Sequence, residues 1–251
     1  MNIILLAEEE IVNQQVTLLD YRAKHIVKIL RSKQGDRVTV GIINGKTGYG
    51  IIKEIAIKQP YMVTLDVTTD SPPPPPPLID IIIALPRPIM LKRIISQITT
   101  LGVGRIFIVN SEKVEKSYWD SSLITDKSWR QHALSGLEQA VDTRMINLSF
   151  HRGFKPFIEQ TLPRISEKYN QMLVAHPTYK ENLSIVFRSS KRHVLLAIGP
   201  EGGWSEYEIE RMVKKGFTGF GLGPRILKVE TAAIALHAMV SQLQACEDAE
   251  S

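Results

Sequence analysis

Two glycine-bearing loops near the end of the chain carry the residues best suited to bind a small molecule. The first covers residues 197–205 (AIGPEGGWS) and the second covers residues 222–233 (LGPRILKVETAA). Each loop follows an apolar run typical of a buried strand and leads into a helical pattern. Open α/β sheets bind small molecules at the carboxyl ends of their strands. The paired loops therefore predict a ligand site at one edge of a sheet.

The missing motifs exclude several common chemistries. Neither loop is G-x-G-x-x-G, and the chain has no G-x-x-x-x-G-K-[ST] phosphate loop and no G-x-S-x-G nucleophile elbow. Its six histidines have no metal-ligand spacing, so we expect no metal; His237 is interpreted as structural. The single cysteine, Cys246, cannot form an internal disulfide. Glu206 and Glu208 are interpreted as first-turn helix charges rather than an acid/base pair.

Composition indicates a globular protein of one large or two smaller domains, since the chain has 251 residues with 43% hydrophobic and 23% charged residues. The chain contains no run of 18 or more apolar residues, so we expect no membrane-spanning helix. The first ten residues lack the basic start of a secretory signal. We therefore expect a cytoplasmic protein.

Positive charge is concentrated in one short segment. The chain carries a net charge of +5, and residues 21–37 contain six basic residues against Asp36 alone. Such a cluster favours a polyanion such as nucleic acid, although a solvated helix face followed by a turn explains it equally simply. The basic residues are Arg22, Lys24, Lys28, Arg31, Lys33 and Arg37.

Six consecutive prolines at residues 72–77 divide the chain. Consecutive prolines favour an extended polyproline II helix. The run could be a stiff linker or a docking site for a proline-reading module, and we favour the linker. The predicted organisation is a small β-barrel that binds RNA at 1–71, a proline-rich linker at 72–78 and a larger domain at 79–251.

Residues before the prolines predict short strands at 37–43, 48–55 and 61–67, with a turn at Asn44-Gly45. Residues 20–30 predict one helix with Ile26, Val27 and Leu30 facing inward. A small barrel fits this pattern, although barrel shape alone does not establish RNA binding.

Residues after the prolines alternate between strand and helix. Strands are expected at 79–85, 105–110, 146–150, 172–176 and 194–198, and helices at 89–101, 122–140 and part of 157–169. Ser205 and Glu208 form a capping box for the helix after the first glycine loop. This alternation predicts an α/β fold, a mostly parallel sheet with helices on both faces.

The two loops together resemble the signature of RsmE-type RNA methyltransferases of the SPOUT superfamily. The similar residues are 198–203, 222–227 and 230–232, and the basic stretch 25–31 resembles the family's N-terminal motif. The resemblance implies a C-terminal domain with a deep trefoil knot and a small N-terminal β-barrel of the PUA or OB type. It also implies a homodimer that uses S-adenosylmethionine to methylate uridine N3 in small-subunit ribosomal RNA. The last helix, with apolar and small residues, supports the dimer.

The resemblance and the residue types together nominate the site. Glycine permits close backbone approach, proline stiffens the loops, and Leu222, Ile226 and Leu227 offer apolar walls. The expected cofactor residues are Leu85, His176, Pro177, Ile198, Gly199, Pro200, Glu201, Gly202, Gly203, Leu222, Gly223, Pro224, Ile226, Leu227, Thr231 and Ala232. Phosphate contacts are expected from Arg22, Lys24, Lys28 and Arg31.

Loss of the uridine N3 proton calls for a base, or for a cation that stabilises the uridylate. Arg225, Glu201, Arg144 and Lys228 are the candidates, and they stay unranked. Glu201 could instead be a helix-entry charge.

Several positions depart from the family pattern: Gln97, Thr100, Val141, Asp142 and Lys228. The loops that bind the cofactor are intact, whereas positions expected to face RNA have changed. A diverged member acting on another RNA, or an RNA-binding protein without turnover, therefore stays open. A third alternative is an enzyme acting on a small nucleotide, with the barrel used for dimerisation; the basic segment argues against it.

Overall fold

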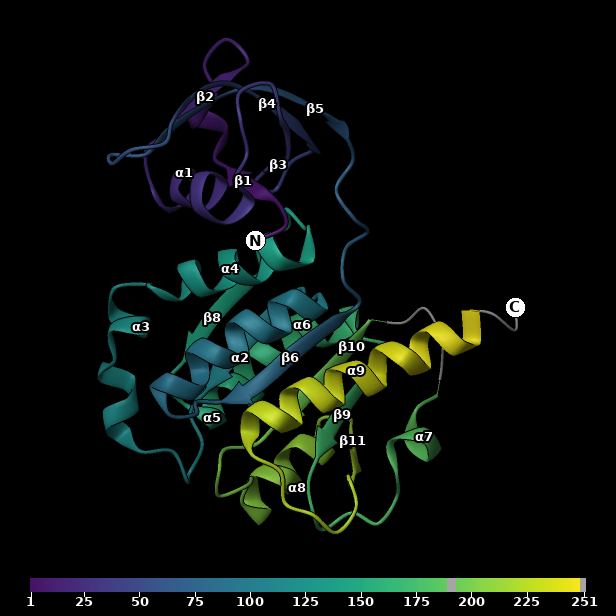
Figure 1. Cartoon of the computed structure of the whole chain (residues 1–251). Coiled ribbons are helices and arrows are strands. Elements are labelled where there is room, and N and C mark those ends of the chain that lie inside the picture. Colours follow the sequence, from purple (N-terminus) through teal and green to yellow (C-terminus); the bar gives the residue numbers. More distant parts are fainter. Residues whose placement is uncertain (189–192, 249–251) are drawn as a thin grey trace. The chain divides into compact units, whose positions relative to one another are not determined.

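The computed structural model describes residues 1–188 and 193–248, and the chain divides into two compact units (Figure 1). Unit 1 comprises Met1–Pro76 and Leu134–Met145, and unit 2 comprises Pro77–Ala133 and Ile146–Ser251. No pattern in the sequence indicated that the second segment of unit 1 packs with the N-terminal part. The domain ranges proposed from the sequence remain a proposal.

Unit 1 is built on a five-stranded sheet with the order β1-β3-β4-β5-β2. Strands β1 and β3 run parallel to each other, and the other neighbouring pairs in this sheet are antiparallel. Strands β3 and β4 form the predicted hairpin, with Asn44 at φ 60° in the turn. The strands are β1 (Ile4–Leu6), β2 (Gln15–Leu18), β3 (Arg37–Ile42), β4 (Thr47–Ala56) and β5 (Met62–Ser71), and a short 3₁₀ turn, η1 (Glu8–Glu10), follows β1.

The helix of unit 1 begins as α1 (Tyr21–His25) and widens into a π-helical stretch, η2 (Ile26–Leu30). Asp20 caps it by accepting a hydrogen bond from the Arg22 amide at 2.9 Å. Ile26 is fully buried as predicted, but the prediction for Leu30 is wrong, since that residue is 45% exposed. A π-turn holds more residues than an α-turn, so side chains beyond it rotate away from the expected face.

Unit 2 contains a six-stranded sheet with the order β11-β9-β10-β6-β7-β8, in which every neighbouring pair is parallel. Strands β6 and β10 are buried along their whole length, as parallel strands covered on both faces must be. The predicted α/β class with a parallel sheet is confirmed. The strands are β6 (Ile79–Ala84), β7 (Arg105–Val109), β8 (Asn147–His151), β9 (Gln171–Ala175), β10 (Val194–Ile198) and β11 (Phe217–Phe220).

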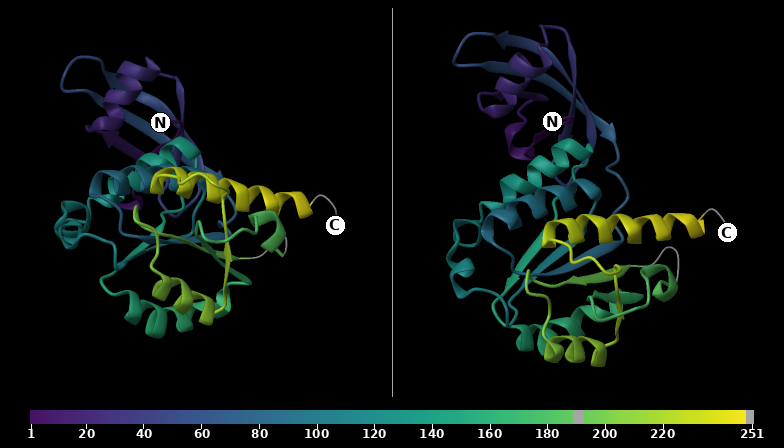
Figure 2. Two further views of the ribbon diagram at one scale, coloured as in Figure 1. Left: turned by 90° about the horizontal axis from the view of Figure 1, so that it is seen from below. Right: turned by 60° about the horizontal axis from the view of Figure 1, so that its bottom comes forward.

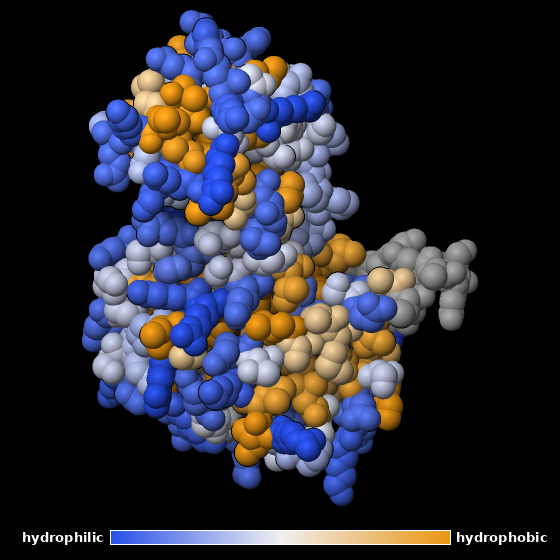
Figure 3. Space-filling model, in the orientation of Figure 1, coloured by the Kyte–Doolittle hydropathy of each residue, from blue (hydrophilic) through white to orange (hydrophobic). Residues whose placement is uncertain are grey.

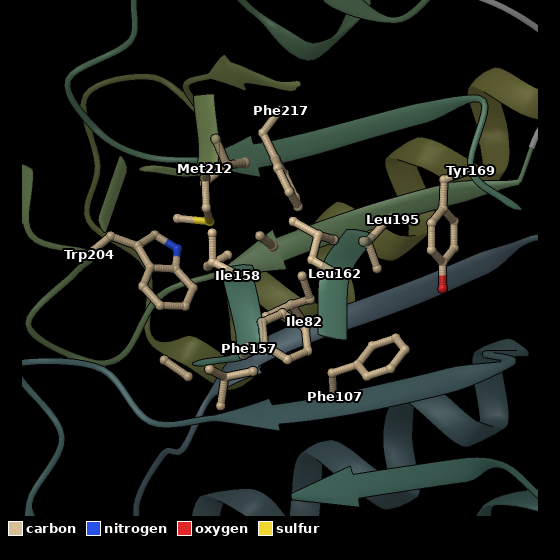
Figure 4. Packing of buried hydrophobic residues seen from close by; sticks show 14 residues of the cluster. Ile82, Phe107, Phe157, Ile158, Leu162, Tyr169, Leu195, Trp204, Met212 and Phe217 are labelled. Carbon is tan, nitrogen blue, oxygen red and sulfur yellow. The ribbon is translucent and has the colours of Figure 1, made fainter. Parts of the chain in front are cut away.

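Helices cover both faces of this sheet, as Figure 2 shows. One face carries α2 (Pro88–Leu101) and α9 (Val229–Asp248), and the other carries α8 (Glu206–Lys214) and a helical segment at 154–168. That segment comprises α5 (Phe154–Pro156), η4 (Phe157–Thr161), α6 (Leu162–Ile165) and η5 (Ser166–Lys168); a further turn, α7 (Leu183–Val186), follows β9. The core beneath α8 packs Phe107, Phe157, Leu195, Trp204 and Phe217 together (Figure 4).

Two helix boundaries test the sequence interpretation. Helix α2 stops at Gly102, whose φ of 87° only glycine adopts without strain, as predicted. The prediction of a single helix at 122–140 is wrong. The chain forms η3 (Lys116–Asp120), α3 (Ser122–Thr125) and α4 (Trp129–Ala140), and Lys127 between the last two has a φ of 54°. A left-handed residue cannot continue a right-handed helix.

No helix of the described residues is long and apolar enough to cross a membrane.

Candidate ligand pocket and basic surface

The two glycine loops meet in unit 2 and line one pocket of about 200 Å³. The first loop follows β10, the second follows β11, and the end of β9 contributes a third wall. Of the residues predicted to hold a cofactor, those that line the pocket are His176, Pro177, Ile198, Gly199, Pro200, Glu201, Gly202, Gly203, Leu222, Gly223, Ile226, Leu227 and Ala232, and Arg225 lines it as well. Loops separated in the sequence thus form one cavity.

Backbone geometry explains why these loops need glycine. Gly203 and Gly223 have φ values of 70° and 87°, a conformation that other residues adopt only with strain. A Cβ at Gly199 would lie 3.0 Å from the Trp204 amide nitrogen. The Gly203 amide donates to the Pro200 carbonyl at 2.8 Å, closing the first loop into a tight turn. Both loops therefore present backbone groups to the cavity at close range.

Glu208 fixes the first loop from beneath. The predicted capping box is confirmed: Glu208 accepts from the Ser205 amide at 2.9 Å, while Ser205 caps the helix. The same carboxylate, on a residue 2% exposed, also accepts from the Ser111 hydroxyl at 3.0 Å and the Glu112 amide at 2.9 Å. It thus ties the first loop to the segment after β7, a tether that no pattern in the sequence indicated.

The outer side of the first loop is held by two further contacts. Lys113 Nζ donates to the Gly202 carbonyl at 2.8 Å. The Arg87 amide donates to Glu201 Oε1 at 3.3 Å. Glu201 itself is exposed and lies before Ser205, the cap of α8, while the amide that it accepts from belongs to Arg87, the N-cap of α2. The interpretation of Glu201 as a helix-entry charge stays open beside a functional role. The Glu201 carboxylate lies at the pocket, as does the exposed Arg225.

Trp204 and His176 both line the pocket. The Trp204 side chain is 2% exposed, and its Nε1 has no hydrogen-bond partner within the described part of the chain. His176 shares a 2.8 Å hydrogen bond between Nδ1 and the Thr178 hydroxyl. Burial lowers the pKa of His176, which keeps the ring neutral near pH 7.

Three predicted cofactor residues do not line the pocket. Leu85 is fully buried and donates its amide to the Val109 carbonyl at 2.9 Å, whereas Pro224 and Thr231 are exposed. The sequence analysis missed four lining residues: Ala175, Trp204, Val229 and Leu236. Val229 and Leu236 share a face of α9 with Ala232, so helical spacing could have found them. Trp204 follows Gly203 directly.

Arg144 belongs to unit 1, unlike Arg225 and Glu201. Its Nε donates to the Pro74 carbonyl at 2.5 Å, and its amide donates to Asp142 at 2.9 Å.

The expectation that Arg22 contacts phosphate is wrong. Arg22 is 8% exposed. Its guanidinium forms ion pairs with Glu10 at 2.5 Å and Asp20 at 2.7 Å, and it donates to the Leu5 carbonyl at 2.8 Å. These partners engage all three guanidinium nitrogens, which leaves none for a phosphate. The residue is a structural element of unit 1.

The other three residues expected to contact phosphate are exposed: Lys24, Lys28 and Arg31. Lys28 Nζ lies 5.5 Å from the centroid of the Tyr61 ring. Arg31 ends the helix with a φ of 54°. Asp36 accepts from the Lys33 amide at 2.7 Å, and within the described residues no ion pair joins it to Arg31.

The described residues contain no cluster of three or more His, Cys, Asp or Glu that could hold a metal ion.

Comparison with known proteins places this geometry in context. A family model described as an RNA methyltransferase domain matches residues 73–241. Ribosomal RNA small subunit methyltransferase E of Treponema pallidum is 32% identical over 244 residues, covering 96% of this chain and 90% of that protein. Ribosomal RNA small subunit methyltransferase E 1 of Borreliella burgdorferi is 26% identical and covers 94% of this chain and 95% of that protein.

Solved structures share the fold. A Neisseria gonorrhoeae ribosomal RNA small subunit methyltransferase E bound to S-adenosyl methionine superimposes with a TM-score of 0.76 at 23% identity, covering 97% of this chain and 98% of that one. A Legionella pneumophila methyltransferase in complex with the same cofactor gives a TM-score of 0.77 at 22% identity, covering 96% and 97%.

Proposed function

Because the chain belongs to the RsmE-type family of RNA methyltransferases, we propose that it transfers a methyl group from S-adenosylmethionine to N3 of a uridine in small-subunit ribosomal RNA. The observation that carries the proposal is the single cavity of about 200 Å³ formed by both glycine loops. The two curated relatives described above are named ribosomal RNA small subunit methyltransferases.

The pocket residues fit S-adenosylmethionine in chemical terms. Apolar walls from Leu222, Ile226 and Leu227 suit a purine, and backbone groups of the glycine loops suit its hydrogen-bonding edge. When bound, the cofactor supplies an electrophilic methyl group on a sulfonium that is its own leaving group.

Glu201 and Arg225 are the side chains placed to act on the substrate. Uridine N3 must lose its proton to become a nucleophile. Glu201, an exposed carboxylate at the pocket, is the proposed base, and its carboxylate is oriented by the Arg87 amide at 3.3 Å. Arg225, exposed at the same pocket and without an ion pair in the described part of the chain, is proposed to stabilise the uridylate. Arg144 stays a second candidate cation.

RNA is proposed to bind along Lys24, Lys28 and Arg31 of unit 1. All three are exposed, and phosphate contacts position RNA without reading its sequence. The proposal also retains a small N-terminal β-barrel, a trefoil knot in unit 2 and a cytoplasmic location.

A homodimer is proposed through α9. Ala233, Leu236 and Val240 are buried within unit 2, whereas Met239 is 41% exposed. Figure 3 shows apolar side chains gathered over this helix. A surface of this kind is typical of an interface between subunits. Light scattering at micromolar concentration is expected to give the mass of two chains, and a mass of one chain would contradict the dimer.

Radiolabelled methyl transfer tests the reaction. The full chain, labelled S-adenosylmethionine and small ribosomal subunits are expected to give labelled RNA. Glu201→Gln is expected to slow transfer by about 100-fold or more, the range for loss of a general base. Glu206→Gln is the matched control, since this carboxylate lies in the first turn of α8 and outside the pocket. A wild-type protein that binds cofactor and RNA but transfers no label would instead be an RNA-binding protein without turnover.

A further inference from the structure

A second hollow, of about 340 Å³, lies wholly on unit 1. Strands β3 and β4, the end of β5, the proline run and the turn after α4 all contribute to its lining. None of the residues assigned above to cofactor or phosphate binding lines it. Its size is at the lower end of the range for small-ligand sites, which begins at about 300 Å³. The hollow is therefore large enough for a nucleobase.

An arginine stacked on a tyrosine forms one side of the hollow. The Arg37 guanidinium carbon lies 3.6 Å from the centroid of the Tyr49 ring. Val38 and Val40 face the core, so alternation along β3 directs Arg37 to the solvent face of the sheet. Arg37 is exposed and has no ion pair within the described residues. The guanidinium face turned away from Tyr49 is therefore open to a planar ligand.

A β-bulge places a carboxylate at the same hollow. Thr47 pairs with Ser71 while Gly48 pairs with Thr69, so Asp70 is an extra residue without a partner on β4. Bulges redirect side chains and occur next to binding sites. The bulge requires glycine at position 48, because a Cβ there would collide with the Thr68 carbonyl oxygen. Asp70 lines the hollow and accepts from the Ser71 hydroxyl at 2.9 Å.

The opposite rim is held in a fixed and strained shape. Val141 lines the hollow with a φ of 57°, which is unfavourable for a β-branched residue. The segment is held by Arg144, whose Nε donates to the Pro74 carbonyl, and by the Asn44 amide, which donates to the Thr143 carbonyl at 2.7 Å. Local strain that surrounding contacts maintain is concentrated at binding sites.

We propose that this hollow binds one unpaired guanine nucleotide of the RNA substrate. The base stacks on the open face of Arg37, as unpaired bases do on guanidinium planes. Its N1–H and N2–H groups donate to the two carboxylate oxygens of Asp70. The proposal rests on the function proposed above, since it takes the substrate to be RNA.

Chemistry selects guanine among the four bases. A carboxylate only accepts hydrogen bonds, and guanine alone presents two neighbouring donors on its Watson–Crick edge. Adenine and cytosine each place a ring acceptor beside the amino group, and uracil places carbonyls on both sides of its N–H. The acceptor pair of Asp70 therefore suits guanine among the four bases.

Fluorescence anisotropy with the full chain tests the proposal. The probes are labelled pentanucleotides of uridine whose central position is guanosine, adenosine or inosine, the last lacking the N2 amino group. Wild type is expected to bind the guanosine probe at least tenfold more tightly than the other two. Arg37→Lys keeps the charge but loses the plane, and about a tenfold weaker affinity is expected, within the range for loss of one stacked base. Asp70→Asn is expected to abolish the preference for guanosine.

Ile51→Ala is the matched control. Ile51 lies opposite Arg37 on β4, is 42% exposed and does not line the hollow, so its removal is expected to change no affinity. Equal affinity of wild type for all three probes, or an unaffected Arg37→Lys variant, would overturn the guanine site. Methyl transfer by wild type, measured in parallel, separates the two claims: if it persists, the proposed function stands without this site, and if it is absent together with RNA binding, both fall.

Discussion

Replacement of Gly223 by leucine tests the assignment of the cofactor pocket. Gly223 lines the cavity with a φ of 87°, and no atom lies within 4 Å of the position a Cβ would occupy. A leucine there suffers backbone strain of about 1–2 kcal/mol and extends into a cavity of about 200 Å³. Displacing a purine-sized group of roughly ten non-hydrogen atoms, at ~0.3 kcal/mol each, costs about 3 kcal/mol. The affinity for S-adenosylmethionine is therefore expected to fall by roughly 100-fold or more.

Gly35→Leu is the matched control for strain. Gly35 lies in unit 1 with a φ of 88°, also without neighbours within 4 Å of a Cβ. Both variants are expected to lose similar stability, a fall in Tm of about 2–8 °C. Titration calorimetry is expected to show 1:1 binding per subunit for wild type and for Gly35→Leu, and almost none for Gly223→Leu. Normal binding by a folded Gly223→Leu variant would refute the pocket assignment.

Three further predictions concern two groups of basic residues in unit 1 and the buried His237 in unit 2. Arg22→Met is expected to destabilise unit 1 by about 2–3 kcal/mol. This is less than the loss of a fully buried ion pair would cost, because the carboxylate partners of Arg22 are 32% and 44% exposed. Unchanged amide hydrogen exchange in β3 and β4 would contradict this prediction. Replacing Lys28 and Arg31 together with alanine is expected to reduce the salt slope of RNA binding by about two units; an unchanged slope would remove this surface from the RNA-binding role. Burial lowers the pKa of His237 below its unfolded value, so the unfolded state binds more protons as the pH falls from about 7 to 5 and stability drops. Urea unfolding of His237→Gln is expected to show a weaker pH dependence, and an unchanged dependence would assign the effect elsewhere.

Sequence patterns predicted the sheet of unit 2 and most of the pocket, because both depend on local signals. Strand β10 was predicted with its observed bounds, since a continuous apolar run between turn residues has few other interpretations. The glycine loops were found because glycine is needed where the backbone turns left-handed or approaches a ligand.

Long-range contacts could not be predicted. Arg22 was expected to be a surface cation, but its partners Glu10 and Leu5 come from other elements that pack around it. The tether from Glu208 to Ser111 joins segments far apart in the sequence. The π-turn that exposes Leu30 leaves no mark in hydrophobic spacing. In each case tertiary packing, and not local propensity, decides the outcome.

Mass-spectrometric mapping of methylated nucleosides in small-subunit ribosomal RNA tests the central claim most directly. RNA from cells that contain this protein would be compared with RNA from cells that lack it. The cells that lack it would also be supplied with either the wild-type protein or the Glu201→Gln variant. The account predicts one N3-methyluridine that is lost without the protein, restored by wild type and not restored by the variant. Identical methylation with and without the protein would contradict the account.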